Sequence, residues 1–183
     1  MQREFDGHRR SLRSCSAFTL IDAVAAVLIV AILLILLIPE MAGIKERAAA
    51  VRCASNMRSI NLALRGYLLD HEEVWPQGPS PDQEQAWEQF WLEALKNYGI
   101  DPKTWQCPTI NSQLASQGST SADRPRIHYT PTLFDDTPGI ANKWATHPWL
   151  IERSDVHGQG PLICFPDGSI KPFDKVLAEL GVR

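Results

Sequence analysis

The sequence lacks the short motifs that mark many metal, redox and hydrolytic sites. Its four cysteines form no CxxC pair, so a zinc knuckle and a CxxC redox motif have no support. HExxH and GxSxG spacings are also absent. The sequence has no basic excess either. Four of the 18 Lys and Arg residues lie within residues 1–17, and the part beyond residue 38 contains the other 14 together with 18 acidic residues. This balance predicts no nucleic-acid partner.

Charge is nearly absent from residues 18–38, where Asp22 is the single charged residue. At about 1.5 Å per helical residue this apolar run reaches about 30 Å, enough to cross the hydrocarbon of a bilayer. We therefore predict a membrane-spanning helix. Four arginines against two acidic residues in residues 1–17 predict a cytoplasmic N-terminus, with everything beyond Pro39 on the other side.

Asp22 is the anomaly in the predicted span. A carboxylate there costs roughly 2.5–3.5 kcal/mol on insertion scales, less near the helix end, so it needs a compensating partner or a functional reason. Cleavage between Ala17 and Phe18 would place a new α-amino group one helical turn before Asp22. A neighbouring copy could offer the same amine, and we expect this charge pairing to drive assembly.

The stretch Ala17-Phe18-Thr19-Leu20-Ile21-Asp22 before an apolar helix resembles the processing site of class III signal peptides, those of type IV pilins and type II secretion pseudopilins. The resemblance implies that a prepilin peptidase cuts before Phe18 and N-methylates it, and that Asp22 supports assembly. It also implies other pilin or pseudopilin subunits and an inner-membrane assembly platform as partners. Ala17 and Asp22 stand where the family usually has Gly and Glu, whereas Pro39 falls where many pilin helices carry a proline.

Other interpretations of the N-terminus remain open. An ordinary signal peptide would be cut after the apolar stretch, near Ala42, and an uncut anchor would keep its leader. A lipoprotein cysteine at Cys15 has less support because no apolar segment precedes it.

Helical periodicity continues past Pro39, from about Ile44 to Asp70. Before this segment Pro39 can kink the helix and Gly43 can loosen it further. An apolar stripe spaced four, three, four and three lies on its inner face: Cys53, Met57, Ile60, Leu64 and Tyr67. We predict a basic leader (1–17), a transmembrane helix (18–38), its amphipathic continuation (39–75) and a globular head (76–183). The fold class is α+β, with a long N-terminal helix packed on a small antiparallel sheet, as in pilins.

Within the head, Ser80-Pro81-Asp82-Gln83 is typical of a capping box with Ser80 as the N-cap, and predicts a helix to about Tyr98 that Gly99 stops. Residues 108–126, rich in Ser, Thr, Gln and Pro, predict a long surface loop. Strands are predicted at 127–130, 149–152, 162–165 and 169–173, with Pro166-Asp167-Gly168 as a hairpin turn between the last two.

Three cysteines remain once Cys15 leaves with the leader, in a compartment that oxidises thiols. A disulfide between Cys53 and Cys107 is preferred, with buried free thiols as the alternative. Cys164 is then a core thiol in a strand.

A second resemblance covers the C-terminal part. His157 is separated by nine residues from Asp167-Gly168, similar to the terminal hairpin of pilin-like proteins numerous in planctomycetes and verrucomicrobia. Those proteins often carry a Cys-x-x-Asn-Met/Leu-Arg-x-Ile stretch, which residues 53–60 fit, and a Cys-Pro dipeptide, which Cys107-Pro108 matches.

The expected function is a structural subunit of a pilus or type II secretion pseudopilus in the bacterial inner membrane, single-pass, with its head in the periplasm. A non-polymerising, membrane-anchored extracytoplasmic binding module is the alternative. An enzyme is not expected, because the residues that could build a hydrolytic or metal site form no spaced motif: His128, His147, His157, Asp135, Asp136, Asp155 and Asp167. No cofactor is expected and no metal site is assigned, although Asp135-Asp136 or Asp155 offers oxygen ligands of the kind calcium prefers.

Overall fold

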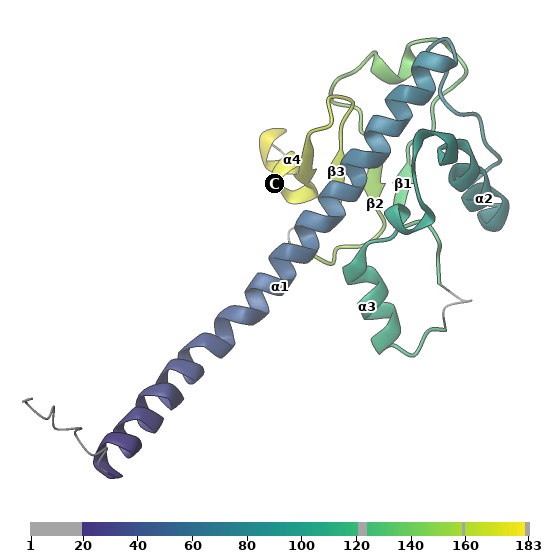
Figure 1. Ribbon diagram of the computed structural model, residues 1–183. Helices are drawn as coiled ribbons and strands as arrows, with labels where there is room; N and C mark the ends of the chain where they lie inside the picture. The colour runs from purple at the N-terminus through teal and green to yellow at the C-terminus, as the bar shows by residue number, and fades with distance from the viewer. Residues whose placement is uncertain (1–19, 121–123, 159, 182–183) are drawn as a thin grey trace, which may run out of the picture. The chain divides into compact units, whose positions relative to one another are not determined.

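The computed structural model describes residues 20–120, 124–158 and 160–181, and within the first helix it describes the backbone alone for residues 35–46. The chain forms two compact units, residues 1–42 and residues 43–183. The second unit has the predicted α+β class, with several helices and a small four-stranded antiparallel sheet (Figure 1).

Helix α1 (Leu20–Asp70) belongs to both units, and neither Pro39 nor Gly43 ends it. From Cys53 onward its inner face is buried as the spacing predicted: Cys53, Met57, Ile60 and Leu64 have no exposed surface. The helix ends where Glu72 and Glu73 take positive φ values, and the Glu73 N–H donates to the Leu68 carbonyl at 2.8 Å. In the described residues, no helix is both long enough and apolar enough to cross a membrane.

Helix α2 (Glu84–Ala94) begins later than predicted, so the expected N-cap at Ser80 is wrong. The Ser80 carbonyl instead accepts from the Gln83 N–H at 2.9 Å, which closes a turn before the helix starts. The stop at Gly99 is confirmed: a 3-10 turn, η1 (Lys96–Tyr98), precedes it, and Gly99 has a φ of 80°. The predicted apolar face is core, with Trp87, Trp91 and Leu95 buried.

Helix α3 (Pro108–Ser116) follows a 3-10 turn, η2 (Pro102–Trp105), and occupies part of the segment predicted to be a loop. That prediction is wrong for residues 108–116. Pro108 stands at the first helical position, where its fixed φ is favourable and its missing N–H costs nothing. Ile110 is buried and Leu114 packs one turn further on against the core, which gives this polar sequence one apolar edge.

The sheet is a meander in the order β1-β2-β3-β4 with every neighbouring pair antiparallel. Its strands overlap the four predicted segments: β1 (Tyr129–Pro131), β2 (Leu150–Glu152), β3 (Leu162–Cys164) and β4 (Ile170–Pro172). A short helix that the sequence analysis did not predict, α4 (Phe173–Glu179), follows β4 directly.

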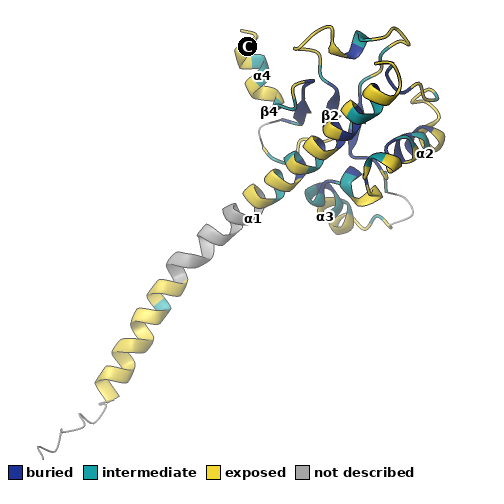
Figure 2. Ribbon diagram, turned by 45° about the horizontal axis from the view of Figure 1, so that its top comes forward, coloured by how far each residue is buried: buried dark blue, intermediate teal, exposed yellow. Residues whose placement is uncertain are grey.

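The core of the second unit joins α1 to α2, α3 and the sheet (Figure 2). Five of the six tryptophans are buried in it: Trp75, Trp87, Trp91, Trp105 and Trp149. Polar contacts also fix α1 on the sheet, because the Asn61 amide donates to the Phe165 carbonyl at 3.0 Å and the Arg65 guanidinium to the Pro166 carbonyl. The tip of the β3–β4 hairpin is therefore held on α1.

Candidate functional site

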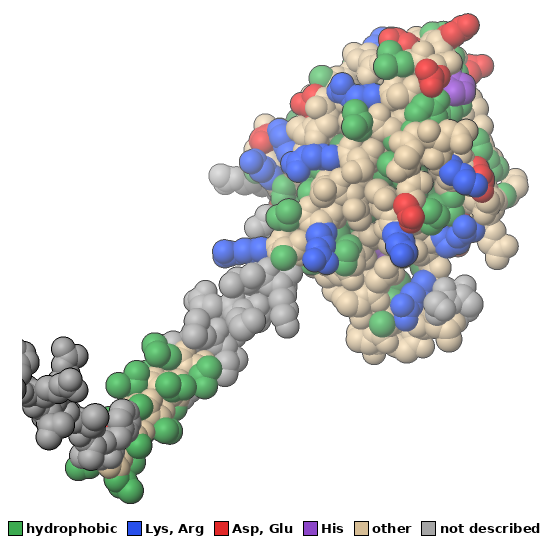
Figure 3. All heavy atoms as spheres, in the orientation of Figure 1, with side chains coloured by type: hydrophobic (Ala, Val, Ile, Leu, Met, Phe, Trp, Pro, Cys, Tyr) green, Lys and Arg blue, Asp and Glu red, His purple; other side chains and the backbone are tan. Residues whose placement is uncertain are grey.

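The first described part of α1 exposes aliphatic side chains at successive positions all round the helix. Figure 3 shows those on the face turned toward the viewer. Each of the following is at least half exposed: Leu20, Ile21, Val24, Val27, Leu28, Ile29, Val30, Ile32, Leu33 and Leu34. A helix of a soluble domain normally confines such residues to one stripe. Asp22 lies in the first turn of the described helix and is exposed. Ala17 and Phe18, the predicted cleavage and methylation positions, lie outside the described residues.

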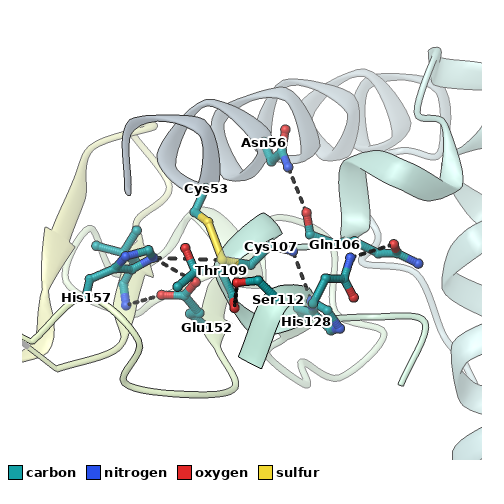
Figure 4. The surroundings of a disulfide bond; sticks show 11 residues. Cys53, Asn56, Gln106, Cys107, Thr109, Ser112, His128, Glu152 and His157 are labelled. Atoms are coloured by element: carbon teal, nitrogen blue, oxygen red, sulfur yellow. Dashed lines mark hydrogen bonds and ion pairs between the residues drawn. A yellow bond between two sulfur atoms is a disulfide. The ribbon is translucent and has the colours of Figure 1, made fainter. Parts of the chain in front are cut away.

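A disulfide links Cys53 of α1 to Cys107, the residue that caps the N-terminus of α3 (Figure 4). This is the pairing that the sequence analysis preferred. The two Cα atoms are 5.2 Å apart, and neither cysteine has exposed surface. Cys164, the third cysteine of the second unit, is a buried free thiol in β3, where burial raises its pKa to about 12. The described cysteines therefore divide into one buried crosslink and one inert core thiol.

Two ionisable side chains lie against this disulfide. His157, in the loop between β2 and β3, places its Nε2 atom 3.9 Å from Cys107 Sγ and 3.3 Å from Glu152 Oε1. The other carboxylate oxygen of Glu152 accepts from the Leu162 N–H at 3.2 Å. The Glu152 side chain has no exposed surface, and this burial raises its pKa. A carboxylate, an imidazole and two sulfur atoms thus share one water-poor space.

His128 approaches the disulfide from its other side and fixes the backbone of Cys107. The Cys107 N–H donates to His128 Nδ1 at 2.9 Å, so that ring nitrogen carries no proton. Burial lowers the pKa of His128. A second contact supports the same segment, because the Asn56 amide of α1 donates to the Gln106 carbonyl at 3.1 Å. The loop that carries Cys107 is therefore held by one covalent and two hydrogen-bonded links.

The two ends of the His157-to-Asp167 motif have different surroundings. His157 lies on the disulfide, whereas Asp167 and Gly168 form the exposed turn between β3 and β4. Gly168 has a φ of 80° and its N–H donates to the Phe165 carbonyl at 2.9 Å, while Asp167 Oδ1 accepts from the Ser169 N–H at 2.8 Å. The Ser169 hydroxyl, and after it the Ser169 N–H, lower the pKa of Asp167 by hydrogen bonding to its carboxylate. The Asp-Gly pair has a turn-forming role, and the histidine packs against the core crosslink.

The histidines and aspartates considered as a hydrolytic or metal site do not gather into one. The His147 ring makes an edge contact with Phe134 and lies tilted to Trp144, and Asp135 closes a turn by accepting from the Thr137 N–H at 2.9 Å. Across residues 20–120, 124–158 and 160–181, one group holds three or more potential metal ligands in close proximity: Cys53, Cys107, Glu152 and His157. Glu152 was not foreseen as a member. The alternation within β2 could have indicated that Glu152 is buried, because Leu150 and Glu152 share the buried face and Ile151 between them is exposed.

Comparisons with known proteins add no family to these observations. The chain matched no protein-family model, no curated protein and no solved structure. Its function is therefore inferred from its own residues.

Proposed function

We propose that this chain is a structural subunit of a pilus or type II secretion pseudopilus, which polymerises through its apolar N-terminal helix. In this proposal it is inserted N-in in the inner membrane with its head in the periplasm. A prepilin peptidase cuts it between Ala17 and Phe18 and methylates Phe18. The observation that carries the proposal is the aliphatic surface of α1 over residues 20–34, which is exposed on every side. Such a surface requires lipid or other apolar helices around it.

A second apolar surface on α1 supports subunit packing. Val51, Leu62 and Leu69 are separated by 11 and seven residues, which returns each of them to the same face of a helix with 3.6 residues per turn. Each is at least 66% exposed, although the opposite face of the helix is core. This stripe offers knobs for a helix of a neighbouring subunit. The chain thus has a packing surface for assembly in its second unit as well as in its first.

The second candidate function is a membrane-anchored extracytoplasmic binding module that does not polymerise. A groove of about 810 Å³ favours it, with Leu62, Leu69, Tyr98 and Trp149 among its lining residues. This volume falls in the range of small-molecule sites. Leu62 and Leu69 belong to both the groove and the stripe, so assembly and ligand binding would use overlapping surfaces.

Replacement of Asp22 tests the assembly proposal. In Asp22→Ala the partner of the adjoining subunit's amine is removed, which for a desolvated pair costs about 3 kcal/mol, more than a hundredfold in association. We expect membrane insertion to be unchanged or more efficient and fibres to be lost. The measurements are membrane fractionation and the yield of sheared fibres, in cells that supply a prepilin peptidase and an assembly platform.

Asp22→Glu is the matched control, because it keeps the charge on a stem one methylene longer. It should retain fibres. A normal fibre yield from Asp22→Ala would show that assembly does not depend on pairing between Asp22 and the amine of an adjoining subunit. Absence of fibres from the wild-type chain, processed and correctly inserted, would favour the binding module.

A further inference from the structure

Four side chains from four different chain segments converge at the disulfide. Cys53 comes from α1, Cys107 from the start of α3, Glu152 from the end of β2 and His157 from the following loop (Figure 4). One ligand atom from each lies within 4.8 Å of all the others. The cysteines and the Glu152 side chain have no exposed surface, and the His157 side chain is 7% exposed. This is a buried cluster of two sulfur atoms, one imidazole nitrogen and one carboxylate oxygen.

The distances match the edges of a tetrahedral zinc site. Bonds of about 2.3 Å to sulfur and about 2.0 Å to nitrogen or oxygen imply ligand separations of about 3.5 Å for sulfur–nitrogen and about 3.3 Å for nitrogen–oxygen. The observed separations are 3.9 Å from Cys107 Sγ to His157 Nε2 and 3.3 Å from His157 Nε2 to Glu152 Oε1. The sulfur atoms would have to move from bonding distance to about 3.8 Å apart, the corresponding tetrahedral edge. Rotation of the two cysteine side chains can supply that movement.

Glu152 is oriented as a metal ligand would be. The Leu162 N–H holds its Oε2 atom, and its Oε1 atom, which faces His157, is buried without a hydrogen-bond partner. His157 Nε2 lies 3.3 Å from this atom, and it balances the carboxylate charge only when the imidazole is protonated. Burying a carboxylate oxygen in this way is costly unless a cation or a donor compensates it. With a neutral His157 the disulfide state supplies neither to Oε1, whereas a bound cation would.

We propose that, when Cys53 and Cys107 are thiols, these two residues with Glu152 and His157 form a Zn²⁺ site, and that disulfide formation abolishes it. Two thiolates, a neutral imidazole and a carboxylate are the ligand types that zinc combines in tetrahedral sites, whereas calcium and magnesium take oxygen ligands. Binding releases the two thiol protons. Because every ligand comes from a different segment, the ion joins α1, α3 and the sheet before the covalent link exists.

The change between the two states is a two-electron oxidation. A disulfide oxidant accepts two electrons from the pair of zinc-bound thiolates, its own sulfur–sulfur bond breaks to give two thiolates, and the Cys53–Cys107 bond forms. The zinc ion leaves because the two sulfur ligands no longer carry charge. The same two cysteines therefore stabilise the head in both states, first through the metal and then through the bond.

Cobalt(II) is the probe for the site. The full-length chain, in non-ionic detergent, is reduced with a phosphine, freed of metal with a chelator and titrated with Co²⁺. We expect one Co²⁺ per chain, with a thiolate-to-metal charge-transfer band and the intense visible bands of a tetrahedral ion, all lost when Zn²⁺ is added. The oxidised chain should bind none. If the reduced chain, whether folded or unfolded, does not bind Co²⁺ with these tetrahedral thiolate bands, the proposal is overturned.

Variants separate a metal site from a purely structural ion pair. Glu152→Gln and His157→Ala should each weaken zinc at least about tenfold, because even outer partners of metal ligands cost that much. Cys164→Ser and His147→Ala are the controls, and zinc affinity should be unchanged in both. Near-ultraviolet circular dichroism of the oxidised forms identifies variants that do not fold. Unchanged zinc affinity in folded Glu152→Gln and His157→Ala contradicts the assignment.

Discussion

His128 acts as a hydrogen-bond acceptor in a place where a proton would be costly. Its Nδ1 atom accepts from the Cys107 N–H, and burial is the main cause that lowers its pKa below the ordinary value of 6.5. Protonation of Nδ1 would break this bond and bring a charge into the core. The unfolded chain has no such constraint and takes up the proton near the ordinary pKa.

A pH dependence of stability follows from His128. Between its lowered folded pKa and the unfolded value, the unfolded state binds more protons, so the free energy of unfolding must fall as the pH falls from about 7 to about 5. In His128→Asn, whose amide oxygen can still accept from the Cys107 N–H, this component is absent. We expect the stability difference between wild type and variant to change over this window in urea titrations followed by tryptophan fluorescence. A constant difference would show that His128 is not buried in its neutral form.

Gly168 sets the geometry of the β3–β4 turn. Its φ of 80° is unfavourable for a residue with a β-carbon, although a β-carbon would meet only ordinary contacts there. Gly168→Ala should therefore lower the free energy of unfolding by about 1–2 kcal/mol through backbone strain alone. Gly168→Asn, which tolerates this region better, should lose less. Equal losses in chemical unfolding would indicate a packing effect instead.

Helix α3 depends on its attachment. It has nine residues, which is too few for an isolated helix to be stable in water, and its N-cap Cys107 is bonded to α1. With a sequence separation of 54 between the cysteines, the chain-entropy relation gives the disulfide about 4 kcal/mol. Cys53→Ala/Cys107→Ala, measured with a chelator present, should lose about this much. Amide exchange in Pro108–Ser116 should accelerate.

Cys164→Ala is the control for that experiment, since it removes a buried sulfur without breaking a crosslink. It should cost clearly less, and α3 should keep its exchange protection. An equal loss in both variants would mean that packing of sulfur, and not the crosslink, stabilises this region.

The elements that could be predicted are those with local causes. The β3–β4 turn was recognised because Asp167 and Gly168 carry their own turn chemistry, and the inner stripe of α1 because its spacing is helical. Helix α3 was missed because it depends on Pro108 and a distant crosslink more than on its polar composition. The start of α2 was misplaced because Ser80 uses its carbonyl in a turn and not its hydroxyl as a helix cap.

The candidate site was only partly visible in the sequence. The cysteine pair could be proposed from helix spacing and from a family-like pattern, but Glu152 lies about 100 residues from Cys53 and no motif links them. Sheet register brings them together, because Leu150 pairs with Cys164 and thereby fixes the face on which Glu152 lies. The alternation within β2 is the one local signal for a buried carboxylate.

At the scale of the whole molecule, the two units differ in how far they bury their apolar side chains. The second unit, which includes the C-terminal part of α1, encloses a core with five of the six tryptophans buried in it. The described part of the first unit has no buried core, and its aliphatic side chains are exposed all round the helix. In the proposed function this helix lies in lipid before assembly and among other helices afterwards.

The N-terminus of the mature chain tests this account most directly. The full-length gene is expressed in cells that contain a prepilin peptidase, the protein is recovered from membranes, and its N-terminal peptide is identified by mass spectrometry. The account predicts a chain that begins at Phe18 and carries one methyl group on its α-amino nitrogen. An intact Met1, or a chain that begins near Gly43, would contradict it.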